Sequence, residues 1–471
     1  QRDPDPGPGR PHHRVTAGTP VYGHRSTAAI AEVREIDGRT VSWFSLEGGK
    51  HRGAIGTPEG ETIARALHLA VELGMPIVGR IASSGADVSE GLSALHAWGK
   101  VAKALTDASG VVPIVLVLVG PAVSGPALLL GIADHVIMTA DAFAYVTGPE
   151  VVTAFTGVPI TSDRLGGAQV HERESGVATL VVADEDEALV ALETLLSYLP
   201  SNHLQDPPFE TTDDPVDRPC ARAASAVPAR ATASYDVRTV IDDVCDEHTF
   251  LELRPNYAPN MVTGLSRLGG RPVGIVANQP MFRAGTLDIE ASRKAARFVQ
   301  WCDAFNFPIV TFVDTPGFEP GRDLEWRGMI RHGAELVHAY AEATVPRLCI
   351  LLRKAYGGAY IVMDSKNLGN DWCMAWPTAE VAVMGAPGAV QILHRRQLAA
   401  IDDAAERLTE QAALEAEYSA RFANPYVAAE RGYVDDVIAA SDTRRVLADA
   451  LLRLSTKREQ QPPRRHSNTP L

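Results

Sequence analysis

The sequence predicts an α/β protein made of two copies of one structural unit. Short apolar segments of strand length alternate with longer segments of helical periodicity, an order that favours helices packed on buried strands. Matching residues recur at a nearly fixed spacing along the chain. A stretch rich in proline separates the two sets of matches, which places a boundary between the copies.

Length and composition limit the function. The chain has 471 residues, enough for two substantial cores, and its hydrophobic fraction of 45% is typical of a globular protein. Its net charge of −14 argues against a nucleic-acid partner, because phosphates would be repelled. No apolar run reaches the roughly 18 residues of a membrane span. The five cysteines are scattered, with no Cys-x-x-Cys pair, so we expect free thiols, a cytoplasmic location and no metal site.

The elements of the first half can be expected in order. Residues 1–20 lack an apolar core segment and are rich in Pro, Gly, His and Arg, so we expect a disordered leader. Two strands joined by a turn at Asp37-Gly38 should follow, then a helix that Gly74 ends. A strand, a helix, a strand and a short helix complete the series. The expected elements lie at residues 31–36, 40–44, 60–73, 76–81, 89–109, 111–119 and 127–132.

The repeat can be measured from matched residues. Arg65 matches Arg297, and Gly85 matches Gly317 at the same spacing. Further along, Pro113 matches Pro346 and Gly125 matches Gly358, both at a spacing one residue longer. Two long segments therefore keep register to within one residue, which indicates a tandem duplication.

The duplication sets the expected domains. Residues 206–234, with prolines among Asp, Thr and Ala, should hold no regular element and form an interdomain linker. We therefore expect an N-terminal domain at 21–205 and a C-terminal domain at 235–455. Residues 456–471 should be a tail that is flexible or used in packing.

Two matched turns are the candidates for chemistry. Residues 120–130 read Gly-Pro-Ala-Val-Ser-Gly-Pro-Ala-Leu-Leu-Leu, and residues 354–363 read Lys-Ala-Tyr-Gly-Gly-Ala-Tyr-Ile-Val-Met. Each follows a buried strand and opens an apolar helix, whose first N–H groups have no partner within the helix. Such amides suit an oxyanion hole, which stabilises a carbonyl oxygen as it becomes negative. The alternative for either turn alone is a close-packed connection with no ligand.

No nucleophile accompanies these turns. Ser124 does not lie in a Gly-x-Ser-x-Gly elbow, and neither His135 nor His171 is tied to it by a motif, so a Ser-His hydrolase is disfavoured. Two oxyanion holes without a nucleophile suit a reaction between two carbonyl compounds, one of which becomes an enolate. The other matched turns, at residues 83–85 and 314–317, read first as scaffold.

Taken together, the motifs of the second half resemble one known family. The resemblance is to the carboxyltransferase β subunits of biotin-dependent acyl-CoA carboxylases, and most to the acetyl- and propionyl-CoA carboxylases of actinobacterial type. It runs almost unbroken from about Tyr235 to Arg396. The motifs are Phe-Arg-Ala-Gly-Thr-Leu-Asp at 282–288, Lys-Ala-Ala-Arg-Phe-Val at 294–299, Cys-Asp-Ala-Phe at 302–305, Val-Asp-Thr-Pro-Gly-Phe at 313–318, Ile-Arg-His-Gly-Ala at 330–334, Arg-Lys-Ala-Tyr-Gly-Gly-Ala-Tyr at 353–360, Ala-Trp-Pro-Thr-Ala-Glu at 375–380 and Val-Met-Gly-Ala at 383–386.

The resemblance implies a fold, an assembly and a reaction. Each half would be a crotonase-like ββα superhelix domain. The N-terminal domain would bind acyl-CoA and the C-terminal domain would receive carboxybiotin from a partner α subunit that carries biotin carboxylase and the biotin carrier. The assembly would be a hexamer, a dimer of trimers. The reaction would move CO2 to the α-carbon of acetyl-CoA or propionyl-CoA, giving malonyl-CoA or methylmalonyl-CoA, with no protein general base and no metal.

The resemblance also assigns residues. The amides of Gly358 and Ala359 would hold the biotin ureido oxygen, and those of Ser124 and Gly125 the thioester carbonyl. Ile361 matches the acyl-pocket position, where an apolar residue suits short chains. The turns around these positions complete the expected substrate-binding set, which is Ser84, Gly85, Ala86, Gly317, Tyr356, Gly357 and Ile361.

The first half departs from the family pattern. Ser-Ser-Gly-Ala-Asp at 83–87 stands where the family usually has Ser-Gly-Gly-Ala-Arg, so Asp87 replaces a cation. Val-Ser-Gly-Pro at 123–126 stands where the family usually has Ala-Gly-Gly-Ala. Two alternatives therefore remain open beside the carboxyltransferase: a biotin-independent acyl-CoA decarboxylase, and a non-catalytic paralogue that organises a carboxylase assembly.

Overall fold

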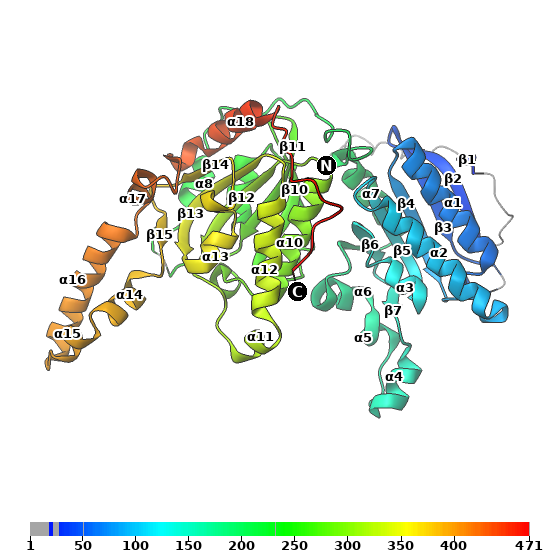
Figure 1. The fold of residues 1–471 in the computed structure, drawn as a ribbon, viewed down its shortest axis with the longest axis horizontal. Helices are drawn as coiled ribbons and strands as arrows, with labels where there is room; N and C mark the ends of the chain where they lie inside the picture. The colour runs from blue at the N-terminus through cyan, green and yellow to red at the C-terminus, as the bar shows by residue number, and fades with distance from the viewer. Residues whose placement is uncertain (1–17, 22–27, 50, 231, 471) are drawn as a thin grey trace, which may run out of the picture. The chain divides into compact units, whose positions relative to one another are not determined.

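The computed structural model describes residues 18–21, 28–49, 51–230 and 232–470. The chain forms two compact units, Gln1–Gln205 and Asp206–Leu471 (Figure 1). Each unit is an α/β domain with its own sheet and its own buried apolar core. The α/β class and the two-unit organisation predicted from the sequence are therefore confirmed.

The sheet of the first unit is mostly parallel. Its order is β1-β2-β3-β4-β5-β6-β8, with β7 paired to β5 beyond the main path. Strands β1, β2 and β3 pair antiparallel, and every later pairing is parallel. The strands are β1 (Thr19–Pro20), β2 (Ala29–Ile36), β3 (Arg39–Leu46), β4 (Ile77–Ser83), β5 (Ile114–Val123), β6 (His135–Thr139), β7 (Phe143–Tyr145) and β8 (Leu180–Val182).

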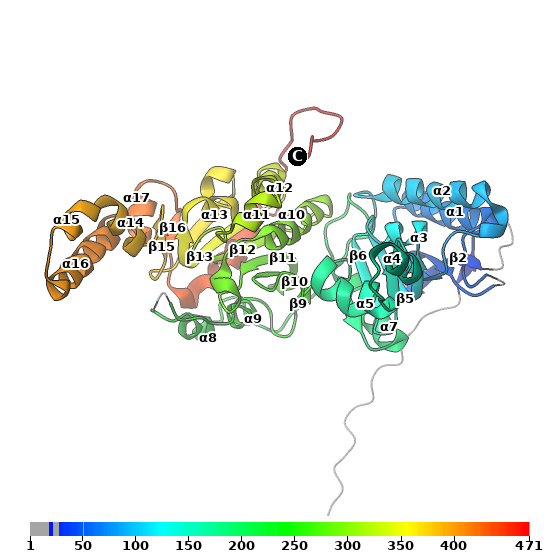
Figure 2. The same ribbon diagram turned by 90° about the horizontal axis from the view of Figure 1, so that it is seen from below.

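Helices cover both faces of this sheet. Figure 2 shows α1 and α2 side by side on one face and α7 on the other. Helix α1 ends where expected, because Gly74 takes the left-handed conformation with φ 64° and its N–H reaches the last carbonyls of the helix. The helices are α1 (Thr57–Leu73), α2 (Leu92–Ala108), α3 (Gly125–Leu129), α4 (Pro149–Thr156), α5 (Ser162–Gly166), α6 (Ala168–Val170) and α7 (Glu185–Tyr198).

The sheet of the second unit repeats this topology strand for strand. Its order is β9-β10-β11-β12-β13-β14-β16, with β15 paired to β13 in the place that β7 takes beside β5. The strands are β9 (Leu251–Leu253), β10 (Met261–Leu268), β11 (Arg271–Asn278), β12 (Ile309–Thr315), β13 (Arg347–Tyr356), β14 (Trp372–Ala375), β15 (Glu380–Ala382) and β16 (Asp436–Val437). The predicted tandem duplication is thus seen in the fold itself.

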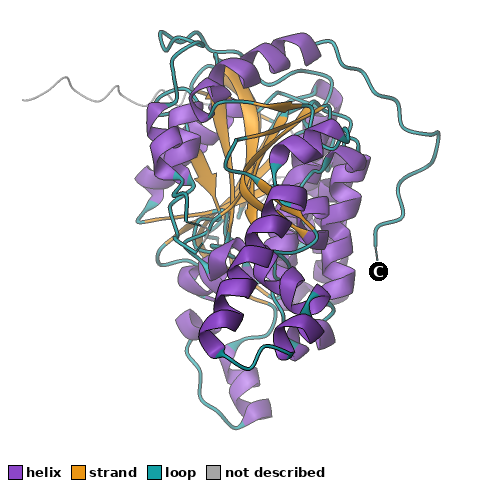
Figure 3. Cartoon of the chain, turned by 90° about the vertical axis from the view of Figure 1, so that its left-hand side faces the viewer, coloured by secondary structure: helices purple, strands orange, loops and turns teal. Residues whose placement is uncertain are grey.

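The helices of the second unit include the counterparts of α1, α2 and α3, which are α10, α12 and α13, and helices flank both faces of the strands (Figure 3). Helices α14 to α17 extend this unit beyond its sheet. The helices are α8 (Ala221–Ala226), α9 (Arg238–Val244), α10 (Ile289–Ala304), α11 (Arg322–Trp326), α12 (Met329–Glu342), α13 (Gly357–Val362), α14 (Ala386–Leu393), α15 (Arg395–Ala399), α16 (Ala404–Phe422), α17 (Pro425–Glu430) and α18 (Thr443–Leu454).

The duplication extends to an irregularity in the sheets. Between β4 and β5 the register shifts between Ile81 and Ser83. Between β12 and β13 it shifts between Val313 and Thr315, which are the matching positions of the repeat. A shift at the carboxyl end of a strand re-aims the backbone that follows it. Within each unit, the turn after β4 or β12 is therefore directed toward the turn after β5 or β13.

Two expectations about the connecting segments were wrong. The stretch 206–234 belongs to the second unit and contains helix α8, so it is not a linker without regular structure. The buried guanidinium of Arg444 donates to the carbonyls of Asp214 and Pro215 and so ties the stretch to α18. Thr19–Pro20, expected within a leader, pairs with β2, whereas residues 1–17 lie outside the described residues.

The described helices include none that is long and apolar enough to cross a membrane. All five cysteines are buried and unpaired. The tail beyond α18 packs on the second unit, where Lys457 Nζ lies 2.9 Å from Asp371 Oδ2.

Candidate functional site

In the second unit, the turn from β13 to α13 is built around glycine. Strand β13 is buried along its whole length, and Gly357 follows it with φ 59°, a conformation that favours glycine. Gly358 and Ala359 come next, in the first turn of α13, where backbone amides lack partners within the helix. A Cβ at Gly358 would meet only Phe318, at an ordinary 3.6 Å, so there is space on the side-chain face of this residue.

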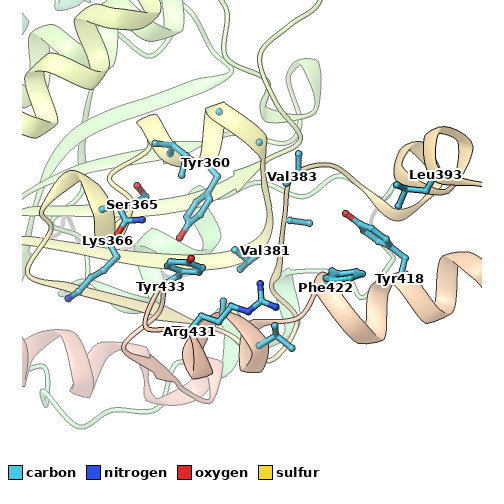
Figure 4. Close-up of a pocket in the computed structure, with 17 residues that line it drawn as sticks. Tyr360, Ser365, Lys366, Val381, Val383, Leu393, Tyr418, Phe422, Arg431 and Tyr433 are labelled. Atoms are coloured by element: carbon cyan, nitrogen blue, oxygen red, sulfur yellow. The ribbon is translucent and has the colours of Figure 1, made fainter.

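An apolar pocket of about 590 Å³ adjoins this turn (Figure 4). Gly357, Gly358 and Ile361, three of the predicted site residues, line it. The rest of the wall comes from α13 and the turn after it, from β15, and from the extension of helices α14 to α17. Its other members are Tyr360, Ser365, Lys366, Asn367, Val381, Ala382, Val383, Leu393, Tyr418, Phe422, Val427, Ala428, Arg431 and Tyr433.

A buried ion pair fixes the strand ends beneath the turn. Arg353 Nε donates to Asp314 Oδ2 at 3.0 Å, and both side chains are excluded from solvent. The backbone N–H of Lys354 donates to the other carboxylate oxygen at 3.1 Å. Arg353 also reaches the carbonyl of Ala233 at 2.8 Å and stacks on the Tyr235 ring, 5.1 Å from its centroid. The ends of β12 and β13 are therefore held at one fixed spacing.

Tyr356 and Gly317, both expected to bind substrate, lie at the edges of this arrangement. Tyr356 is buried, and its hydroxyl donates to the Glu380 carboxylate. Burial, and then the hydrogen bond to that carboxylate, raise the pKa of the Tyr356 phenol. Gly317 has φ 145° in the turn after β12, directly before Phe318, whose ring faces Gly358. Gly317 is thus placed beside the turn, whereas the Tyr356 side chain supports the turn from within.

In the first unit, the turn from β5 to α3 has one donor fewer than expected. The N–H of Ser124 donates to the carbonyl of Tyr145 at 2.9 Å, which extends the pairing of β5 with β7. This amide is already engaged, so the expectation that Ser124 and Gly125 both present amides is corrected to Gly125 alone. Glycine is required there, because a Cβ would lie 2.6 Å from the Trp98 ring of α2.

The turn after β4 adjoins this one. Gly85 has φ 114°, and a Cβ on it would lie 3.2 Å from the carbonyl oxygen of Val123 and 3.7 Å from the side chain of Ser124. Ala86 forms an isolated parallel bridge with Ile55. Gly85 is therefore brought beside Ser124, and Ser84 and Ala86 are its neighbours in the same turn.

Several residues around the two turns were missed by the sequence analysis. Trp98 covers Gly125, and Tyr418 and Phe422 of α16 line the same pocket as Gly358. A helical pattern shows which side chains share a face, but it does not show which distant turn that face will meet. Within the described residues, no cluster of His, Cys, Asp or Glu is arranged to hold a metal ion.

The geometry suits stabilisation of oxygen charge more than attack by a side chain. His135 is buried in β6, and His171 contacts the carbonyl of Ala144 and the hydroxyl of Ser175. Neither histidine is therefore placed by these contacts as a base for Ser124. The features available at the second-unit turn are helix-start amides and an apolar wall, which strengthens hydrogen bonds to a developing negative oxygen.

Comparison with known proteins gives the same picture. The carboxyl transferase domain family matches residues 24–469. The carboxyltransferase subunit of propionyl-CoA carboxylase from Haloferax mediterranei is 47% identical over 93% of this chain and 84% of its own length. The methylmalonyl-CoA decarboxylase subunit alpha of Veillonella parvula is 42% identical over 93% of this chain and 84% of its own length.

A solved structure agrees with the fold. The transcarboxylase 12S hexamer crystal structure, with methylmalonyl-CoA and methylmalonic acid bound, superposes with a TM-score of 0.92 at 40% identity. The match covers 96% of this chain and 89% of that one, which confirms the predicted crotonase-like fold class. The repeated topology, the matched turns and these similarities lead to one conclusion: the chain belongs to the carboxyl transferase domain family and is a carboxyltransferase.

Proposed function

We propose that this chain is the carboxyltransferase subunit of a biotin-dependent acyl-CoA carboxylase that carboxylates acetyl-CoA or propionyl-CoA at the α-carbon. The products would be malonyl-CoA and methylmalonyl-CoA. One observation carries the proposal: the turn at Gly358 and Ala359 starts helix α13 beside an apolar pocket that Gly358 lines, with its strand ends fixed by the Arg353–Asp314 pair.

The second unit fits carboxybiotin. A pocket of about 590 Å³ with an apolar wall suits a compact fused ring, and the amides of Gly358 and Ala359 are the donors for its ureido oxygen. Carboxybiotin would supply the carboxyl group. The contribution of the chain is to orient that oxygen and to place the apolar side chains of the pocket wall, Tyr418 and Phe422 among them, around the ring.

The first unit is assigned the acyl-CoA. The Gly125 amide donates to the thioester carbonyl, which favours the enolate as it forms. Ser84, Gly85 and Ala86 line the approach to this position, because Gly85 packs against Val123 and Ser124. The apolar surface for the short acyl chain is assigned to Ile361 of the second unit, which is 41% exposed in the wall of its pocket.

The partner is a protein that carries biotin carboxylase and the biotin carrier, and the assembly is a hexamer, a dimer of trimers. The names of the relatives support the partner, since one is a propionyl-CoA carboxylase subunit. The hexamer of the 12S structure supports the assembly. Five unpaired cysteines support the reducing conditions of the cytoplasm.

The test is reconstitution with the biotinylated protein that copurifies with the chain. Wild type should consume ATP and bicarbonate only when acetyl-CoA or propionyl-CoA is present, and the carboxylated product should appear by mass spectrometry. Ile361→Asp should lower kcat/KM for propionyl-CoA at least about tenfold, because a carboxylate in an apolar wall is poorly solvated. Ile361→Val is the matched control. No carboxylated product from any acyl-CoA between acetyl and butyryl would contradict the proposal.

A second candidate is decarboxylation of a malonyl- or methylmalonyl-CoA. The similarity to the Veillonella parvula decarboxylase subunit favours it specifically. Release of CO2 from methylmalonyl-CoA by the chain alone, with no biotinylated protein present, would support this candidate over the first. A chain that forms a complex with the biotinylated protein but binds no CoA thioester would be a non-catalytic paralogue.

A further inference from the structure

One wall of the pocket in the second unit is a short segment with little backbone pairing. Residues 381–383, in β15 and directly after it, line the pocket (Figure 4). β15 is three residues long, all of them half-buried, and among the described strands it pairs with β13 alone. A strand this short has few ladder hydrogen bonds, so its position depends on side chains that reach it from β13.

Tyr356, the last residue of β13, contacts this segment at both ends. Its hydroxyl donates to the carboxylate of Glu380, the first residue of β15. Its ring lies against Gly385, where a Cβ would be 3.2 Å from the ring atom Cε2. Tyr356 is 8% exposed, so its hydrogen bond to Glu380 is partly shielded from water. The two contacts bracket residues 381–383.

The residue after Tyr356 brings the turn against the same wall. A Cβ on Gly357 would lie 3.0 Å from the carbonyl oxygen of Val383. Gly357 opens α13 and lines the pocket together with Gly358. The wall and the turn are therefore in close backbone contact, and a displacement of Val383 changes the space between them.

Glu380 lies next to the buried ion pair beneath the turn. Its Cα partner in β13 is Lys354, whose ammonium is 3.7 Å from Asp314 Oδ1. Asp314 is the carboxylate that Arg353 holds. Burial, and then the hydrogen bond to Glu380, raise the pKa of the Tyr356 phenol, so the hydroxyl keeps its proton and remains a donor. The strand ends, the turn and the wall thus form one connected frame.

The first unit lacks this hydrogen bond. Val123 and Phe143 occupy the positions that correspond to Tyr356 and Glu380, as the pairing of β5 with β7 shows. Neither of these apolar side chains can donate or accept a hydrogen bond. The ring of Phe143 instead stacks on that of Tyr145, with the ring centroids 5.5 Å apart. Because the shared frame is complete without the bond, its presence in the second unit points to what that unit binds.

We propose that Glu380 is a positioning residue for the carboxybiotin ring, and that its bond to Tyr356 holds residues 381–383 against the turn and so sets the width of the pocket. The proposal rests on the proposed function, because the ring is assigned there to this pocket. Without the bond the wall moves outward, and fewer apolar atoms contact the ring. The loss falls on the biotin substrate and not on acyl-CoA, whose thioester is assigned to the turn of the first unit.

The experiment measures reverse transfer, in which methylmalonyl-CoA and biocytin, the amide of biotin with lysine, give propionyl-CoA and carboxybiocytin. Glu380→Ala removes the acceptor, Tyr356→Phe removes the donor, and Glu380→Gln keeps an oxygen that accepts. KM for biocytin should rise about tenfold in the first two, the scale of one hydrogen bond to a charged group, and at most about threefold in Glu380→Gln. Both kcat and KM for methylmalonyl-CoA should stay within about twofold of wild type in every variant.

Hydrogen exchange of residues 379–386 in the free chain reports the wall without any ligand. Exchange should be faster by a similar factor in Glu380→Ala and in Tyr356→Phe, and no faster in the double variant, because both substitutions remove the same bond. Asp449→Ala is the matched control, since it removes an exposed carboxylate paired with Arg453 on α18, and it should behave as wild type in both measurements.

An unchanged KM for biocytin in Tyr356→Phe would overturn the proposal, as would a rise in KM that methylmalonyl-CoA shares equally. Effects that multiply in the double variant would also overturn it, because Glu380 would then act by a route other than Tyr356. A chain that shows the expected exchange pattern but transfers no carboxyl group would instead reject the proposed function, so the two failures are distinguishable.

Discussion

Replacing Ala359 by proline tests the proposed donors of the second unit with little disturbance of the fold. The duplication itself supplies the precedent: Pro126 occupies the matching position of the first copy, in the first turn of α3. Proline is tolerated in the first turn of a helix because the lost N–H has no partner there. The substitution therefore removes one amide donor and leaves the strand, the turn and the Arg353–Asp314 pair in place.

The magnitude follows from the role of the amide. Loss of one oxyanion donor typically lowers kcat by about 100- to 1000-fold, or about 3 to 4 kcal/mol of transition-state stabilisation. The free energy of unfolding should change by about 1 kcal/mol or less, as expected for proline in a first helical turn. The matched control is Gly358→Ala, which keeps its amide and places a methyl group at an ordinary 3.6 Å from Phe318, so it should retain kcat within about threefold.

The assay is carboxylation of propionyl-CoA by the reconstituted complex, with melting temperature and oligomeric state measured in parallel. A fully active Ala359→Pro would show that this amide does not contact the reacting groups. A variant as inactive as expected but already unfolded would be uninformative by itself, so the comparison is made at a temperature where wild type and variant melt at least about 10 °C higher.

Three further predictions concern the frame of the second unit. The buried Lys294 ammonium donates to three backbone carbonyls at 2.6 to 2.8 Å, so Lys294→Met should cost about 3 kcal/mol of unfolding free energy in urea titrations, and an undiminished midpoint would contradict this. Burial raises the pKa of Asp364 from 3.8 to about 6 despite its bond to Arg347, so the folded state binds the extra proton between these values. The stabilisation that comes from protonated Asp364 is present below pH 3.8 and is lost as pH rises through 6. Relative to Asp364→Asn, the free energy of unfolding of wild type should therefore fall by roughly 3 kcal/mol over that window. Parallel curves of unfolding free energy against pH for the two proteins would refute this prediction. Gly285→Ala should destabilise by at least about 2 kcal/mol, because its φ is 77° and the new methyl would meet a carbonyl oxygen at 2.6 Å, whereas Gly321→Ala, with nearest contacts at 3.5 Å, should be nearly neutral in the same thermal melts.

Features that depend on neighbouring residues in the chain, such as turns and helix ends, were predictable from the sequence. The strand-to-helix turns are marked by small residues and by Val-Pro before each strand, and Gly74 ends its helix in the expected left-handed conformation. The duplication was measurable because both copies keep these marks in register to within one residue. Such signals depend on neighbours in the chain, so they survive without knowledge of the fold.

Features that depend on distant partners were not predictable. Asp87 reads in sequence as the loss of a cation, yet it is the partner of His51 from another loop. The proline-rich stretch reads as a linker, yet the carbonyls within it are bound by Arg444 from the far end of the unit. The engaged amide of Ser124 depends on Tyr145 in a strand formed later in the chain. Each of these is a long-range choice of partner that a local pattern does not record.

The buried Arg353–Asp314 pair has a consequence for how the two halves evolve. At the matching positions the first unit has Gly120 and Ala82, and a Cβ on that glycine would touch the alanine methyl at 3.1 Å. One copy thus joins its strand ends with charge, and the other with close contact between small residues. Because the two copies are separate segments of the chain, a substitution that stiffens or relaxes one turn leaves the other turn unchanged. A protein that paired two identical halves would have to change both at once, and would lose the freedom to treat two substrates differently.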